Sequence, residues 1–139
     1  MTVNVEIKAA DPEICAACHE IALAYGMEKK VIYSSFNHFQ LAEMKKVDPD
    51  AFIAPLYGFN MLKPWDYCVN ISAAASHPRQ NQISLIPEYV EECHKRGIRV
   101  HPWTVNEEAD MKFLADAGCD AIITNYPDVA KALLLLEKK

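Results

Sequence analysis

The feature that most constrains the fold is a repeated alternation, along the 139-residue chain, between short β-rich apolar runs and helix-forming stretches. Strands that alternate with helices predict βα units and a parallel sheet. The apolar runs do not alternate cleanly with polar residues, which is typical of strands covered on both faces. The expected strands cover residues 3–8, 31–34, 51–56, 68–72, 98–103 and 121–124.

Helix-forming stretches separate these strands. Asn37 is expected to cap a helix that stops before residue 48, because asparagine side chains satisfy the first free backbone N–H groups. Residues 62–67 predict a turn or a short helix, and the small, polar stretch over residues 73–82 predicts a loop. Gly97 is expected to end a helix that begins near residue 87. The last two helices are expected over residues 106–118 and from residue 127 onward.

Two α/β architectures fit this pattern. One is an open, doubly wound sheet, and the other is part of a (β/α)8 barrel, which usually needs about 250 residues. The chain has only four glycines and contains no G-x-G-x-x-G string, so a Rossmann dinucleotide site is poorly supported. A phosphate-binding G-x-x-x-x-G-K-[ST] loop is also missing from the sequence.

The charge and cysteine content exclude several classes of protein. The formal net charge is −5, so general nucleic-acid binding, which usually needs a basic excess, is not expected. The longest apolar run, over residues 132–136, is far shorter than the roughly 20 residues of a membrane span. Five cysteines without a compact spacing favour free thiols, and the N-terminus does not resemble a signal peptide. These observations predict a cytoplasmic protein.

Polar side chains follow the expected strands at the edge where parallel α/β folds place their functional residues. Glu6 and Lys8 are two positions apart on a strand, so they point to the same face. A carboxylate there can ligate a hard cation such as Mg²⁺ or Ca²⁺, and a lysine beside it can bind a phosphate as a point charge. His101 and Trp103 share a face in the same way, which predicts an aromatic wall at the rim.

Four segments together resemble the glycerophosphodiester phosphodiesterase family. They are residues 4–8 (NVEIK), 34–37 (SSFN), 97–106 (GIRVHPWTVN) and 118–127 (GCDAIITNYP). They occur in the family's order and extend over nearly the whole chain. The family has a TIM-barrel fold and cleaves a glycerophosphodiester into sn-glycerol 3-phosphate and an alcohol with the help of a divalent cation. The resemblance therefore implies a partial (β/α)8 barrel and a small-molecule phosphodiester substrate.

The resemblance also implies roles for individual residues. Glu6 matches a metal ligand, and Lys8 matches a residue near the substrate phosphate. Phe36 and Trp103 match residues that line the substrate pocket. Asn125 matches a rim position at the end of the last barrel strand, where the family often has aspartate.

The sequence departs from the family at its start. The family begins with a His-Arg-Gly strand end and continues with a Glu-x-Asp strand end and a downstream histidine. These motifs supply the two catalytic histidines and two more metal carboxylates, and we do not find them here. The resemblance thus implies a single incomplete barrel domain over residues 1–139, with about six of eight βα units, that is inactive by itself. Its site for Mg²⁺ or Ca²⁺ would be incomplete.

Two further expectations concern the open parts of such a barrel. His77 lies in the expected loop after the fourth strand, on the side where sites form, so we take it as a candidate substrate contact.

A barrel that lacks two strands exposes unpaired strand edges and apolar surface, which are costly to leave in water. We therefore expect either self-association or a missing N-terminal segment that covers those edges.

Three hypotheses about function follow from the sequence. The first is the C-terminal part of a metal-dependent glycerophosphodiester phosphodiesterase. The second is a non-catalytic module of that fold, which binds a phosphate ligand or serves in oligomerisation. The third is an unrelated βα enzyme acting on another phosphorylated ligand, because barrels host many chemistries.

Overall fold

The strands of the protein form one parallel sheet. A computed structural model describes residues 1–11 and 13–136, with the strands adjacent in the order β1-β2-β3-β4-β5. Each strand pairs in parallel with the next, so the predicted parallel α/β sheet is confirmed. The strands are β1 (Val3–Glu6), β2 (Val31–Ser35), β3 (Phe52–Tyr57), β4 (Ala75–Pro78) and β5 (Arg99–Val100).

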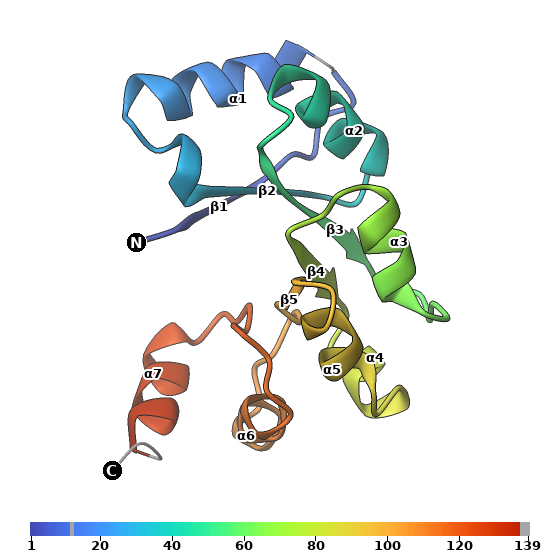
Figure 1. The fold of residues 1–139 in the computed structure, drawn as a ribbon. Helices are drawn as coiled ribbons and strands as arrows, with labels where there is room; N and C mark the ends of the chain where they lie inside the picture. The colour runs from blue at the N-terminus through green and yellow to red at the C-terminus, as the bar shows by residue number, and fades with distance from the viewer. Residues whose placement is uncertain (12, 137–139) are drawn as a thin grey trace.

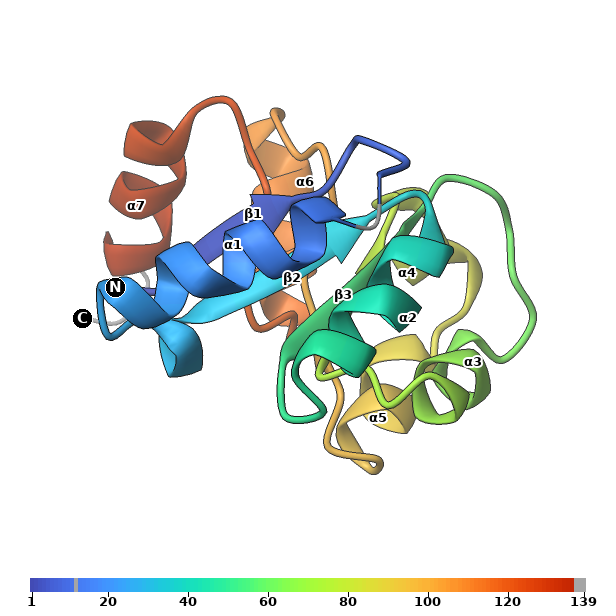
Figure 2. The same ribbon diagram turned by 90° about the horizontal axis from the view of Figure 1, so that it is seen from above.

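Helices connect the strands and lie along one side of the sheet. In Figure 1 they follow one another in an arc around the strands, from α1 through α3 and α5 to α7. Figure 2 shows α1 and α2 lying over β1, β2 and β3. The helices are α1 (Glu13–Ala24), α2 (His38–Val47), α3 (Pro64–Asn70), α4 (Asn81–Leu85), α5 (Tyr89–His94), α6 (Glu108–Asp116) and α7 (Pro127–Leu136), and Glu28–Lys30 form a 3₁₀ turn.

Alternate strand residues face two different surroundings. Side chains on the outer face, such as Tyr33 and Ile53, pack with the helices in the main hydrophobic core. The strand register places Glu6 opposite Ser34 and Ser34 opposite Ala54, so these three side chains share the inner face. Ile32, Ala54 and Ala75 form a second buried cluster on that face, and a parallel sheet with helices outside and buried side chains inside is typical of a barrel.

Local sequence signals set several helix ends. The Asn37 side chain accepts a hydrogen bond from the Phe39 N–H at 3.2 Å, which confirms the predicted cap of α2. Gly97 follows α5 with a φ of 72°, a conformation that other residues adopt at a cost. The inward residues predicted for α5 are all buried; they are Tyr89, Val90 and Cys93.

The prediction for the fourth strand is wrong. Residues 68–72 belong to the end of α3 and the turn after it, and the strand β4 lies in the stretch predicted as a loop. Pro64 occupies the first turn of α3, and Trp65 and Cys68 bury the inward face of that helix. All four β4 residues are buried although three are small or polar, so hydrophobicity did not mark them.

The segment predicted as a sixth strand, residues 121–124, does not form one. It nevertheless runs beside the extension of β5. The Ile123 N–H donates to the Pro102 carbonyl at 2.9 Å, and the Ile123 carbonyl accepts from the Val105 N–H at 2.9 Å. The segment therefore continues the wall by isolated backbone hydrogen bonds without a regular ladder.

Two simple properties complete the description. All five cysteines are free thiols. Within residues 1–11 and 13–136, we find no helix with the length and apolar character needed to cross a membrane.

Candidate functional site

A carboxylate and an ammonium group lie together at the carboxyl end of β1. Glu6 is the last residue of the strand, and the Lys8 Nζ lies 3.9 Å from its Oε2 atom. The side chains are 34% exposed for Glu6 and 79% exposed for Lys8, so solvent weakens their attraction. The pair is therefore open to a ligand and contributes little to stability.

An aromatic wall stands at the same end of the sheet. The rings of Phe36, just after β2, and Trp103, after β5, meet edge to face with centroids 5.2 Å apart and an interplanar angle of 83°. The Trp103 Nε1–H donates a hydrogen bond to the His77 carbonyl at 2.7 Å. A Cβ atom built on Gly58 would lie 3.5 Å from the indole, so the chain after β3 also touches this wall. Three strand ends thus hold the indole in place.

His77 lies on β4, and its side chain is only 1% exposed. Its Nε2 atom lies 3.0 Å from Nδ1 of His101, which follows β5. His77 Nδ1 is buried and has no hydrogen-bond partner among the described residues. An unpaired lone pair costs less than an unpaired N–H, so the tautomer with the His77 proton on Nε2, donating to His101, is favoured. The placement of His77 in a surface loop was wrong because β4 was not recognised.

Burial and nearby positive charge keep both imidazoles neutral at pH 7. Burial, the neighbouring His101 and the Arg99 guanidinium lower the pKa of His77 to about 3. Burial and Arg99 also lower the pKa of His101, although the Asp120 carboxylate acts in the opposite direction. A group with a pKa near 3 is not matched to proton transfer at neutral pH. The His77–His101 pair is therefore suited to a structural role, in which it joins β4 to the segment after β5.

Asp120 connects β5 to α5. Its carboxylate accepts hydrogen bonds from the Val100 N–H at 2.8 Å and from His94 Nε2 at 2.9 Å. These two hydrogen bonds outweigh partial burial and lower the pKa of the Asp120 carboxyl. The aspartate therefore stays ionised beside the histidine pair.

Asn125 is held within its own loop. Its backbone N–H donates to Asn106 Oδ1 at 3.1 Å, and the Thr124 hydroxyl donates to the same oxygen at 3.4 Å. The Asn125 side chain is exposed. Among the described residues, no hydrogen bond or ion pair joins it to Glu6 or Lys8. The structure thus brings together Glu6 with Lys8 and Phe36 with Trp103, while Asn125 stays separate.

A metal site is not complete within the described part of the chain. It contains no group of three or more His, Cys, Asp and Glu side chains arranged to hold a metal ion. Glu6 is a single carboxylate with an ammonium group beside it, whereas Mg²⁺ and Ca²⁺ take six or more oxygen ligands. The residues present therefore do not fit a complete divalent-cation site.

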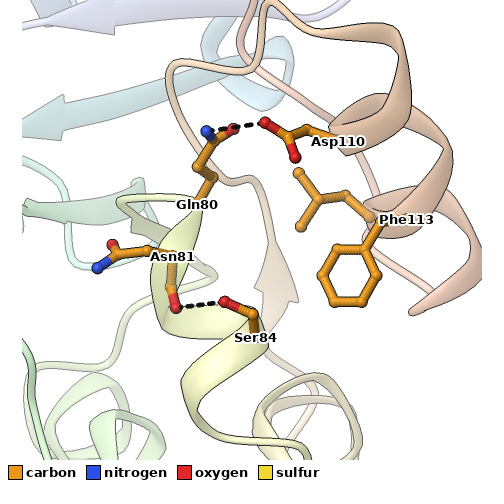
Figure 3. Close-up of a pocket in the computed structure, with 6 residues that line it drawn as sticks. Gln80, Asn81, Ser84, Asp110 and Phe113 are labelled. Atoms are coloured by element: carbon orange, nitrogen blue, oxygen red, sulfur yellow. Dashed lines mark hydrogen bonds between the residues drawn. The ribbon is translucent and has the colours of Figure 1, made fainter.

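A small pocket lies between α4, with the residue before it, and α6. It has a volume of about 180 Å³ and includes Gln80, whose backbone N–H donates to the Trp103 carbonyl at 2.9 Å. Figure 3 shows the Gln80 side chain pointing to Asp110, and its Nε2 donates to that carboxylate at 3.2 Å. None of the residues predicted for the site from the sequence lines this pocket.

The sequence reasoning missed an apolar groove beside the wall. It includes Phe36 itself together with Phe39, Gly58 and Phe59, and has a volume of about 560 Å³. The signal that could have found it is the run of aromatic residues directly after two expected strand ends, at positions 36, 39 and 59.

Comparisons with known proteins agree on one family. The sequence profile of the "Glycerophosphoryl diester phosphodiesterase family" matches residues 2–129. A glycerophosphodiester phosphodiesterase of Caldanaerobacter subterraneus subsp. tengcongensis is 38% identical over 129 residues, covering 91% of this chain and 52% of that protein. The chain spans about half the length of the curated relatives it matches.

Solved structures share the fold. A glycerophosphodiester phosphodiesterase from Parabacteroides distasonis superposes with a TM-score of 0.85 at 21% identity, covering 99% of this chain and 59% of that one. An Oleispira antarctica phosphodiesterase, solved in complex with the product sn-glycerol-3-phosphate, gives a TM-score of 0.80 at 24% identity, covering 96% and 55%. These likenesses confirm the partial (β/α)8 barrel.

Proposed function

Because the chain belongs to the glycerophosphoryl diester phosphodiesterase family, we propose that it forms one side of the active site of an enzyme that hydrolyses glycerophosphodiesters. Water is added across a P–O bond, the alcohol leaves, and sn-glycerol 3-phosphate is released. The observation that carries the proposal is the pairing of Glu6 with Lys8 beside the wall formed by Phe36 and Trp103.

The residues of this chain have separate roles in the proposal. Lys8 binds the phosphate through its exposed ammonium group. Phe36 and Trp103 exclude water from one side of the pocket and hold the substrate against the charged pair. His77 does not contact the substrate itself in this proposal. It positions Trp103, because its carbonyl accepts the hydrogen bond of the indole N–H. Asn125 contacts the substrate from the rim with its exposed amide.

Glu6 is proposed as one ligand of a divalent cation, which in this family supplies charge neutralisation at the phosphate. The described residues do not complete that site, so the other ligands and the groups that move protons lie outside them. We therefore propose that this polypeptide on its own binds the product and does not turn over substrate.

A second candidate is a non-catalytic module that binds a phosphate ligand. The absence of a three-ligand metal group among the described residues favours it. The third hypothesis from the sequence, an unrelated enzyme, is set aside because the family profile matches nearly the whole chain.

Binding and turnover test these proposals separately. Titration of sn-glycerol 3-phosphate, followed by NMR, should give an affinity that falls about tenfold in Lys8→Ala and stays unchanged in Lys112→Ala, a matched exposed lysine on α6. Equal affinities in the two variants would refute the phosphate role of Lys8. Hydrolysis of glycerophosphocholine by this polypeptide, with added Mg²⁺ or Ca²⁺ and a chelator control, is expected to be undetectable.

A fusion distinguishes the enzyme from the module. The segment of the Caldanaerobacter relative that precedes its match to this chain is joined ahead of residue 1. Metal-dependent turnover that Glu6→Gln abolishes would support the enzyme. A folded fusion that binds sn-glycerol 3-phosphate without turnover would support the module.

We further propose that the outer edge of β1 is covered in the working protein, either by another segment or by a second copy. β1 pairs on one side only among the described strands. Sedimentation of the polypeptide at several concentrations distinguishes self-association from a monomer.

We also propose a cytoplasmic location, since five free thiols favour a reducing compartment.

A further inference from the structure

The apolar groove beside the aromatic wall runs between α2 and α3. Its lining also includes Leu56 in β3 and Ile71 after α3. Its volume of about 560 Å³ lies within the range of about 300–1,000 Å³ that small-molecule sites occupy. The groove thus has the size of a ligand site.

Large aromatic side chains are exposed along this groove. Phe36 is 55% exposed, Phe39 is 84% exposed and Phe59 is 61% exposed. Three such rings gathered at one groove mark a binding site more strongly than single exposed apolar residues do. The lining therefore favours an apolar ligand.

The His38 imidazole and the Tyr67 hydroxyl within the groove are already paired with groups of the protein. His38 Nε2 lies 2.9 Å from the Leu56 carbonyl and so carries the proton, which leaves Nδ1 to accept from the Tyr67 hydroxyl at 2.7 Å. Both nitrogens of the imidazole are thus used inside the protein. A polar ligand would find neither of these nitrogens free, so the lining favours an apolar group.

The groove is continuous with the charged end of the site through one residue. Glu6 pairs with Ser34 in the parallel register and the Ile7 N–H donates to the Ser34 carbonyl at 2.8 Å, so the segments that carry Lys8 and Phe36 leave neighbouring strands at the same end of the sheet. Phe36 belongs both to the wall and to the groove. A ligand with a phosphate at Lys8 would therefore have a direct apolar path along Phe36 into the groove.

We propose that this groove binds an aliphatic chain carried by the phosphodiester substrate, so that the preferred substrate is amphiphilic. The inference rests on the proposed function, because it takes the phosphate position from Lys8. The chain is attached either to the glycerol or to the alcohol, and the same groove chemistry serves both.

The test compares soluble ligands with and without an eight-carbon chain. Isothermal titration of the polypeptide uses sn-glycerol 3-phosphate, 1-octanoyl-sn-glycerol 3-phosphate and the octyl ester of sn-glycerol 3-phosphate. We expect at least one octyl ligand to bind ten times or more tightly than sn-glycerol 3-phosphate. In Phe39→Ser and Phe59→Ser that advantage should fall at least fivefold, whereas Tyr25→Ser, which alters an 80% exposed ring after α1, should keep it.

Each other outcome contradicts a defined part of the reasoning. Equal affinities for octyl ligands and sn-glycerol 3-phosphate would overturn the groove and leave the proposed function intact. No binding of any of the three ligands would contradict both. Tight binding to phosphatidylcholine vesicles, lost in the Phe39 and Phe59 variants without any preference for soluble octyl ligands, would make the groove a membrane contact and overturn its role as a substrate site.

Discussion

The buried histidine pair makes the stability of the fold depend on pH in a calculable way. His77 is neutral when folded because its pKa is lowered to about 3, while in the unfolded chain the pKa returns to about 6.5. Between these two values the unfolded state binds a proton that the folded state does not. Stability is therefore fully present above pH 6.5 and is lost progressively as the pH falls toward 3.

The size of the effect follows from the same values. At about 1.4 kcal/mol per pH unit, His77 lowers the free energy of unfolding by about 2.5 kcal/mol between pH 7 and pH 4.5. The side chain is 1% exposed, so solvent screening does not reduce this figure much. Burial also lowers the pKa of His101, which adds a loss in the same direction.

Urea unfolding at pH 7 and pH 4.5, at fixed ionic strength, measures this loss. His77→Gln removes the titration and keeps an amide that can donate to His101 Nδ1. We expect the variant to lose about 2.5 kcal/mol less than the wild type between the two pH values. His19→Gln, on α1 and away from the pair, is the matched control and should not reproduce that gain. An unchanged pH dependence in His77→Gln would refute the assignment of a neutral, buried His77.

Three further changes test the packing around the site, each by urea unfolding at pH 7. Trp103→Ala removes the ring that packs on Phe36 and leaves the His77 carbonyl without its donor, so we expect a loss of about 3 kcal/mol. Tyr89→Phe removes a buried hydroxyl that bonds the Tyr57 and Ser76 hydroxyls, for a loss of about 1–2 kcal/mol. Gly97→Ala meets no atom within 4 Å but keeps a φ of +72°, so a loss of about 1 kcal/mol should come from backbone strain alone.

Signals that act over a few residues were readable from the sequence. Asn37 caps α2 through a hydrogen bond two residues along the chain, and Gly97 ends α5 through its own φ angle. Glu6 and Lys8 were predicted on one strand, but β1 ends at Glu6 and Lys8 follows it, so their proximity of 3.9 Å comes from their closeness in sequence and not from the period of the strand. In each case the outcome depends on local geometry and little on distant packing.

The fourth strand was predicted at the wrong place because the burial of β4 depends on contacts between residues far apart in the sequence. Its four residues are buried from both sides, yet Ser76 and His77 read as loop residues, and the apolar run before them reads as a strand. The burial of Ser76 is made possible by the hydroxyl groups of Tyr57 and Tyr89, which lie 19 and 13 residues away in the sequence. His77 is paired in the same way by His101, 24 residues away. Distant partners lower the cost of burying Ser76 and His77 in a barrel strand, and a single sequence does not show those partners.

The same distinction separates the predicted site residues from the groove. Glu6, Lys8, Phe36 and Trp103 could be predicted as site residues from strand ends, because every parallel barrel gathers its strand ends at one rim. The groove is different, since its lining comes from α2, β3 and α3, which His38 connects by one ring nitrogen to the Leu56 carbonyl and by the other to the Tyr67 hydroxyl. Substrate preference in this protein would then be decided by helix packing outside the barrel, while the phosphate position is decided by the strands. Variation of the helices could change the preferred alcohol or acyl group without disturbing the charged pair on β1.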